Sequence, residues 1–70
     1  SKEGEAIDLG MDCDVVKRSG AWYSFGEVRL GQGRDNSKQY LIDNPEIFAD
    51  LQHKVRKHFG FVDSDEDDGE

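Results

Sequence analysis

Four basic residues between positions 17 and 38 have the chemistry to bind phosphate groups. Arg18 and Arg34 each end in a planar guanidinium whose N–H donors match phosphate oxygens, while Lys17 and Lys38 each add a compact positive charge. Three or four such contacts to a nucleic-acid duplex would give weak, salt-dependent binding that is largely indifferent to base sequence. The alternative interpretation is that all four are ordinary solvated surface charges.

Other kinds of reactive site find little support in the sequence. The segment Gly31-Gln-Gly-Arg-Asp-Asn lacks the Gly-Lys-Ser/Thr ending of a nucleotide phosphate loop and the third glycine of a dinucleotide fingerprint. His53 and His58 have no third metal ligand near them in the sequence, and nothing orients either one against Cys13 as a nucleophile pair. We therefore expect no catalytic residue, no metal site and no cofactor in this chain.

Charge is distributed unevenly along the chain. The net charge is −7, yet residues 15–62 carry eight basic and five acidic side chains. Residues 1–14 carry one base and five acids, and residues 63–70 carry six acids and no base. Because the middle of the chain is net positive between two acidic ends, the overall charge does not exclude a polyanionic partner.

The acidic end, residues 63–70, is predicted to be a disordered tail because it holds no residue that could build a core. Asp63, Asp65 and Asp67 have the spacing that begins a calcium loop, but Asp68 stands where that loop requires glycine, so we expect only diffuse divalent binding. The mobile carboxylates are expected to compete with DNA for the basic residues. They belong to Asp63, Asp65, Glu66, Asp67, Asp68 and Glu70.

The composition predicts one small domain over residues 1–62. With 70 residues, 34% of them hydrophobic, the chain is expected to depend on a few large anchors for its core. Trp22 could stack on a base, but we favour a core position for it. The single cysteine excludes an internal disulfide and suits a reducing compartment. No apolar run is long enough for a membrane span, and no secretion signal is visible. The expected anchors are Trp22, Tyr23, Phe25, Tyr40, Phe48 and Phe59.

The pattern of apolar and turn-forming residues predicts an α+β fold, with one helix, a small three-stranded antiparallel sheet and then two helices. Helix-forming residues from Lys2 to Leu9 predict a first helix, and Gly10 leaves open whether that helix continues. A short strand at Val15 and Val16 then leads into a bend over residues 17–20. Strands at Ala21–Phe25 and Val28–Gln32 are joined by a tight turn at Gly26-Glu27.

The second half of the chain is predicted to hold the other two helices. Asp35 is a suitable N-cap for a short helix that ends at Asp43. Asn44 can cap the last helix, with Pro45 in its first turn, and apolar residues from Ile47 to Phe59 recur at helical spacing. Gly60 is expected to end that helix.

Three blocks of the sequence resemble the carboxy-terminal domain of bacterial RecA-type recombinases. They are Glu3-Gly-Glu-Ala-Ile-Asp-Leu-Gly-Met, the stretch from Lys17 to Tyr40 with its Ser-Gly-Ala-Trp-Tyr-Ser-Phe and Gly-Gln-Gly-Arg-Asp-Asn motifs, and Asp43-Asn-Pro-Glu-Ile. The Gly26-Glu27 turn is one residue shorter than the family's commonest pattern and lacks the basic residue often found there. The resemblance implies that the chain is the end of a longer cytoplasmic protein of DNA recombination, DNA repair and the SOS response to DNA damage.

The resemblance also implies roles for particular residues. Arg18 and Arg34 would contact double-stranded DNA, and residues 63–70 would form an autoinhibitory tail. Lys17 and Lys38, which lie close in sequence to the hairpin, are expected to add secondary contacts. ATP and magnesium would belong to the missing core of the parent protein, and filament neighbours would be further partners. The alternative hypothesis is a protein-interaction lobe that contacts those neighbours or regulators.

Overall fold

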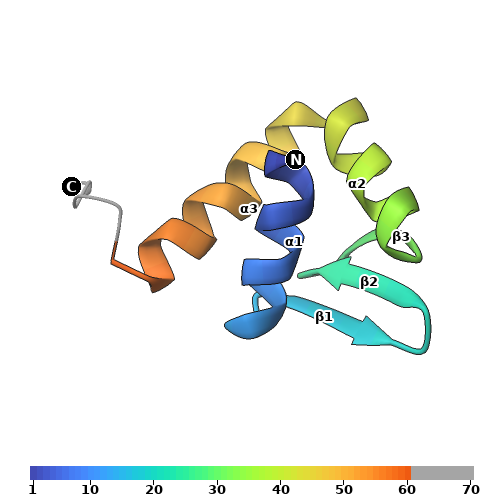
Figure 1. The fold of residues 1–70 in the computed structure, drawn as a ribbon, viewed down its shortest axis with the longest axis horizontal. Coiled ribbons are helices and arrows are strands. Elements are labelled where there is room, and N and C mark those ends of the chain that lie inside the picture. Colours follow the sequence, from blue (N-terminus) through green and yellow to red (C-terminus); the bar gives the residue numbers. More distant parts are fainter. Residues whose placement is uncertain (61–70) are drawn as a thin grey trace.

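The structure is a computed structural model that describes residues 1–60, so the tail predicted at residues 63–70 lies outside the described range. Its order of one helix, three antiparallel strands and two helices confirms the predicted α+β fold (Figure 1). Within the described range, no helix is both long enough and apolar enough to cross a bilayer. The elements are α1 (Lys2–Asp12), β1 (Val16–Ser19), β2 (Trp22–Phe25), β3 (Val28–Gln32), α2 (Arg34–Asp43) and α3 (Pro45–His58).

The sheet is a meander in the order β1-β2-β3, joined by two tight turns. Gly20 and Gly26 each hold the first central position of a two-residue turn with φ near 60°, a geometry that the type II′ hairpin turn requires and that glycine adopts without strain. In β3, Leu30 is an extra residue between Arg29 and Gly31, which pair with consecutive residues of β2. Leu30 lies two residues beyond Val28, the partner of Phe25, and so points toward the core, where it is buried.

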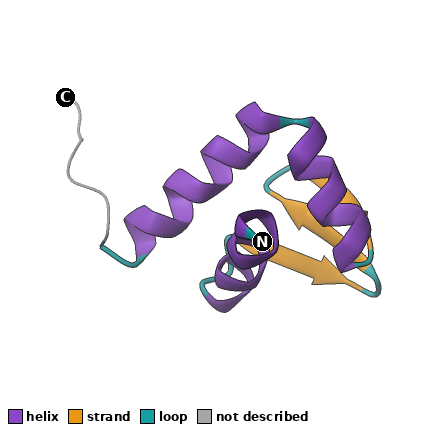
Figure 2. Cartoon of the chain, turned by 45° about the horizontal axis from the view of Figure 1, so that its top comes forward, coloured by secondary structure: helices purple, strands orange, loops and turns teal. Residues whose placement is uncertain are grey.

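The helices cover one face of the sheet. α1 packs against β1, α2 packs against β3, and α3 lies across α1 and α2 rather than on the sheet (Figures 1 and 2). The opposite face carries Lys17, Trp22 and Arg29, all exposed. The fold is therefore a two-layer α+β arrangement in which one side of the sheet stays open to solvent.

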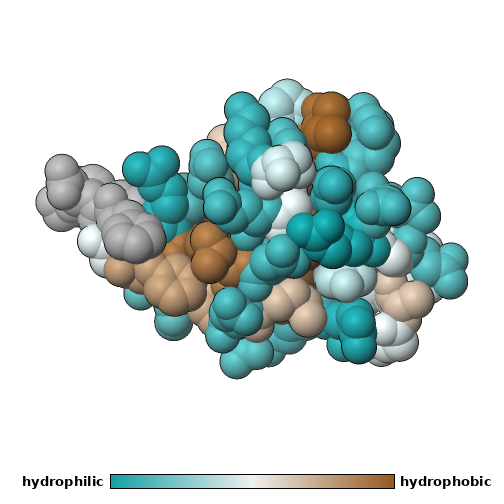
Figure 3. All heavy atoms as spheres, in the orientation of Figure 1, coloured by the Kyte–Doolittle hydropathy of each residue, from teal (hydrophilic) through white to brown (hydrophobic). Residues whose placement is uncertain are grey.

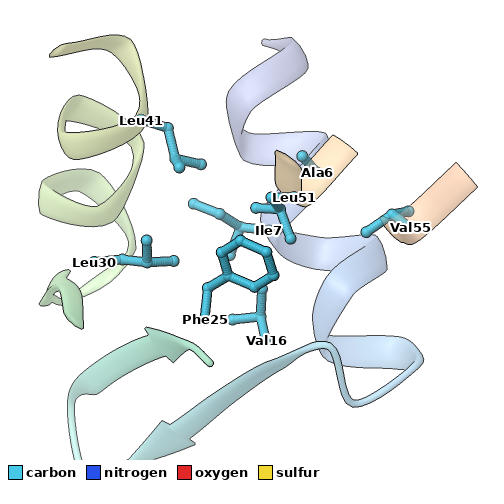
Figure 4. Close-up of a cluster of buried hydrophobic side chains, with 8 residues drawn as sticks. All are labelled: Ala6, Ile7, Val16, Phe25, Leu30, Leu41, Leu51 and Val55. Carbon is cyan, nitrogen blue, oxygen red and sulfur yellow. The ribbon is translucent and has the colours of Figure 1, made fainter. Parts of the chain in front are cut away.

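The core is mainly aliphatic, in contrast to the aromatic anchors that the composition suggested. Of those six aromatic side chains only Phe25 is buried, whereas Trp22 and Phe59 are 40% and 41% exposed. Trp22 was expected in the core, but strand alternation puts it on the face opposite Phe25. Tyr23, Tyr40 and Phe48 pack at the edge of the core. The core itself, shown in Figure 4, comprises Ala6, Ile7, Val16, Phe25, Leu30, Leu41, Leu51 and Val55.

α1 runs past Gly10, the residue at which the sequence left the continuation of the helix open. Gly10 is buried, and a Cβ atom at this position would lie 2.6 Å from Cγ2 of Val16. Glycine at this position lets β1 pack closely against the helix. The helix itself continues to Asp12. Asp14, with φ 63°, then turns the chain out of the helix, a left-handed conformation that aspartate tolerates.

Two other boundaries differ from the sequence prediction. β1 begins at Val16 and includes Lys17 and Arg18, which were expected in a bend. α2 begins at Arg34 with Gly33 as its N-cap, so Asp35 lies inside the first turn and is not the cap.

The start of α3 is partly as predicted. Asn44 is the N-cap residue and Pro45 occupies the first turn, as predicted. The side chain of Asn44, however, makes no capping hydrogen bond and donates to the carbonyl oxygen of Tyr40. Gly60, with φ 81°, follows the last turn, which confirms its place at the end of this helix.

Candidate nucleic-acid interface

The first turn of α2 rests directly on β3 because Gly31 has no side chain. A Cβ atom at Gly31 would lie 3.0 Å from the backbone carbon of Asn36 and 3.1 Å from the amide nitrogen of Ser37. Ser37 is fully buried, and its hydroxyl donates to the carbonyl oxygen of Gly33 at 2.8 Å. The close contact between β3 and the first turn of α2 fixes the position of Arg34, the first residue of α2, relative to the sheet.

A row of paired residues crosses the sheet toward that turn. Arg18 on β1 is paired with Tyr23 on β2, and Tyr23 is paired with Gly31 on β3. Because residues directly opposite each other share a face, Arg18 and Tyr23 both project toward the side that carries the helices. Arg34 continues this row from the start of α2, and Lys38 lies one helical turn further along α2. We refer to Arg18, Arg34 and Lys38 as the cationic rim.

Arg34 forms a bidentate ion pair with Asp8 of α1. Its Nε donates to Oδ1 of Asp8 at 3.1 Å, and its Nη2 donates to Oδ2 at 2.9 Å. The hydrogen bonds from Arg34 lower the pKa of Asp8, and the positive charges of Arg34 and Lys38 act in the same direction. The same hydrogen bonds raise the pKa of Arg34. The carboxylate of Asp8 is therefore ionised at neutral pH and offsets part of the positive charge of the rim.

The start of α2 adds backbone donors beside Arg34. The first helical hydrogen bond runs from the amide of Ser37 to the carbonyl oxygen of Gly33, so the amides of residues 34–36 come before it. The N-cap residue of α2, Gly33, has no side chain to cap the helix. The positive end of the helix dipole and these amides favour an anion at this place, although Asp35 in the same turn opposes it.

The structure separates Lys17 from the other three predicted contacts. Lys17 is paired with Ser24, so it shares the open face of the sheet with Trp22 and Arg29. On that face the Arg29 guanidinium lies over the Trp22 ring, 4.8 Å from its centroid. Arg18, Arg34 and Lys38 are thus on the helix side, and Lys17 is on the opposite side. The six tail acids lie outside the described residues, and their regulatory role stays a prediction.

Sequence reasoning missed Asp8 and the open-face pair of Trp22 and Arg29. Asp8 and Arg34 are 26 positions apart in the chain, and no spacing rule connects them. The pairing depends on how α1 packs beside α2, which a single sequence does not reveal. Within residues 1–60, no three His, Cys, Asp or Glu side chains gather as a group that could hold a metal ion.

A second surface feature is a groove between α1 and α3, with a volume of about 340 Å³. Apolar side chains gather where these two helices meet (Figure 3). Ala6, Leu9 and Val55 line the groove, and Lys2 and Arg56 lie among its charged neighbours. Such a mixture of apolar and charged lining suits contact with another polypeptide.

Comparison with known proteins gives a consistent result. The family model described as the RecA C-terminal domain matches residues 4–60. Protein RecA of Bacillus pumilus is 57% identical over 60 residues, which cover 86% of this chain and 17% of that protein. Protein RecA of Bacillus subtilis is 55% identical over the same coverage. Protein RecA of Streptococcus thermophilus is 46% identical over 68 residues, which cover 97% of this chain and 18% of that protein. The chain therefore spans less than a fifth of the length of these relatives.

Proposed function

Because the chain belongs to the RecA C-terminal domain family, we propose that it is an accessory domain that holds double-stranded DNA for a recombination and repair protein. The observation that carries this proposal is the cationic rim. Its two arginines come from β1 and α2. The row of paired residues from Arg18 through Tyr23 ends at Gly31 on β3, the strand against which α2 packs. ATP hydrolysis and strand exchange would belong to the larger part of such a protein, and this chain would be non-catalytic.

The chemistry of the rim suits phosphate more than base edges. Arg18 and Arg34 are exposed. Arg18 lies on the edge strand β1 and Arg34 at the N-terminus of α2, so neither lies on a helix that could enter a DNA groove to read bases. Contacts of this kind fix a protein on the duplex without reading its sequence. Three phosphate contacts would give a slope of about −3 in a plot of log affinity against log salt concentration. We therefore expect binding that is weak and indifferent to sequence.

Substitution of the two rim arginines tests the proposal. In the 70-residue chain, Arg18→Ala and Arg34→Ala should each weaken binding of a labelled duplex by roughly three- to tenfold at low salt, and each should reduce the salt slope by about one. Arg56→Ala is the matched control, because it removes the same charge from an exposed position near the far end of α3. Fluorescence anisotropy with two duplexes of unrelated sequence measures all of these values. Equal binding by wild type and both rim variants would rule out the rim as the DNA site.

The acidic segment at residues 63–70 supports a regulatory extension of the same proposal. Its six carboxylates would compete with DNA phosphates for the rim, because the acidic segment and the DNA backbone both carry many negative charges. A chain that ends at Val62 should bind duplex more tightly than the full 70 residues, and added magnesium should reduce the difference. If truncation leaves the affinity unchanged at every salt concentration, the tail does not act on this site.

The groove between α1 and α3 favours a second candidate function, a contact with other polypeptides such as filament neighbours. This contact and DNA binding use different surfaces, because the groove is lined by Leu9 and Val55 rather than by the rim. Leu9→Glu should abolish a protein contact at the groove and leave the affinity for duplex within about twofold of wild type. Cross-linking of full-length protein with and without this substitution would measure the effect.

A further inference from the structure

We propose that Gly4 and Asp8 of α1 form a seat that positions the Arg34 guanidinium for a DNA phosphate, which makes Asp8 a positioning residue and not a competitor for that phosphate. This inference rests on the proposed function and adds two residues, Gly4 and Asp8, to the proposed DNA site. Gly4 and Asp8 are one helical turn apart, so they lie on the same face of α1. Arg34 reaches this face from the start of α2.

Gly4 provides the floor of the seat. A Cβ atom at Gly4 would lie 2.7 Å from Nη2 and 3.3 Å from Cζ of Arg34. Gly4 is buried, although Asp8 one turn later on the same face is exposed. The end of the guanidinium therefore lies where the Cβ atom of any other residue would be.

Asp8 provides the wall of the seat and leaves part of the guanidinium open. A guanidinium carries five N–H donors, and Asp8 accepts from Nε and from one donor of Nη2. Within residues 1–60, no other hydrogen bond uses the two donors of Nη1 or the second donor of Nη2, and these donors form the end-on edge that binds phosphate as a fork. The Arg34 side chain is 44% exposed, so a phosphate has access to it.

The seat also reduces the cost of ordering a long side chain. A free arginine loses rotamer freedom when it binds a phosphate, and that loss weakens the contact. Contacts with Gly4 and Asp8 hold the Arg34 side chain in place before DNA arrives. The local charge is lower because of Asp8, but a prepared fork offsets this loss of long-range attraction.

Two substitutions separate positioning from charge. Gly4→Ala changes no charge and displaces the end of the Arg34 side chain, with a second, less severe contact at 3.3 Å from the Ser1 hydroxyl. Asp8→Asn keeps the shape of the residue and removes its charge. If Asp8 positions Arg34, both variants should bind a labelled duplex roughly two- to fivefold more weakly than wild type. Asp12→Asn is the matched control, because Asp12 is an exposed acid of the same helix, one turn beyond Asp8. It should bind as wild type or slightly more tightly.

Further measurements exclude a merely structural effect. Gly4→Ala should unfold at the same or a higher urea concentration than wild type while it binds DNA more weakly, because alanine favours a helix. In an Arg34→Ala background, neither Gly4→Ala nor Asp8→Asn should reduce binding further. Stronger binding by Asp8→Asn than by Asp12→Asn would overturn the inference and identify Asp8 as a competitor. Unchanged binding by both seat variants, with a clear loss in Arg34→Ala, would overturn it while the proposed function stands. Unchanged binding in Arg18→Ala and Arg34→Ala would overturn both.

Discussion

Replacement of Gly10 by alanine tests how α1 is fitted to the sheet. The new Cβ would lie 2.6 Å from Cγ2 and 3.2 Å from Cβ of Val16, and 3.5 Å from Cδ1 of Leu51. Val16 is 1% exposed and β-branched, so it has little room and few rotamers with which to give way. The substitution therefore forces α1 and β1 apart or distorts Val16.

The magnitude follows from two opposing effects on the free energy of unfolding. Alanine is more favourable than glycine inside a helix by up to about 1 kcal/mol. Overpacking of a well-filled core costs about 1–3 kcal/mol. Because the contact is with a rigid buried side chain, we expect the second effect to dominate at Gly10, with a net destabilisation of roughly 1–2 kcal/mol.

Urea unfolding followed by circular dichroism measures this difference, and a double-mutant cycle identifies its cause. Val16→Ala removes the Cγ2 methyl group, the nearest atom to the new side chain. The pair Gly10→Ala with Val16→Ala should therefore be more stable than the sum of the single effects by about 1 kcal/mol or more. A higher unfolding free energy for Gly10→Ala alone would refute the reasoning, because helix propensity would then outweigh packing. An additive cycle would refute the assignment to Val16.

Two further predictions concern Asp8 and Trp22. Because the folded-state pKa of Asp8 is lowered by its hydrogen bonds with Arg34, its contribution to stability is present above the unfolded-state value near 3.8 and is lost as the pH falls through the folded-state value. The urea midpoint of wild type should therefore decrease more than that of Asp8→Asn between about pH 5 and pH 2, and parallel curves would contradict the ion pair. Trp22 is the only tryptophan and is 40% exposed on the open face of the sheet, so acrylamide should quench its emission readily, and more so in Arg29→Ala. Duplex binding at the rim should change that emission little, and strong quenching by DNA would place the duplex on the open face instead.

The order of elements could be predicted from the sequence because local signals mark it. Glycine in two tight turns, Pro45 at the start of α3 and Gly60 at its end act through backbone geometry, which nearby residues determine. Gly10 shows the limit of such signals. Its residue type lowers helix propensity, but the contact with Val16 decides the outcome, and that contact depends on the packing of α1 on β1.

The candidate site was predictable in part for the same reason. Arg18 and Arg34 were identifiable from residue type and from the resemblance, whereas the side of the sheet on which Lys17 lies required the register of β1. The pairing of Asp8 with Arg34 joins two helices across 26 positions of sequence, so it required the tertiary structure. A core position was favoured for Trp22 because composition favours burial of a large aromatic residue, while the alternation of a four-residue strand places it opposite Phe25.

The most direct test of the central claim is an amide-shift titration of the 70-residue chain with a short DNA duplex at low salt. The proposed site predicts that the amides of Arg18, Tyr23 and residues 33–36 shift together and that the shifts disappear as salt is raised. The amides of Leu9 and Val55 in the groove should not move. Shifts confined to the groove or to the open face of the sheet, or no shifts with duplex at all, would contradict a duplex site on the cationic rim.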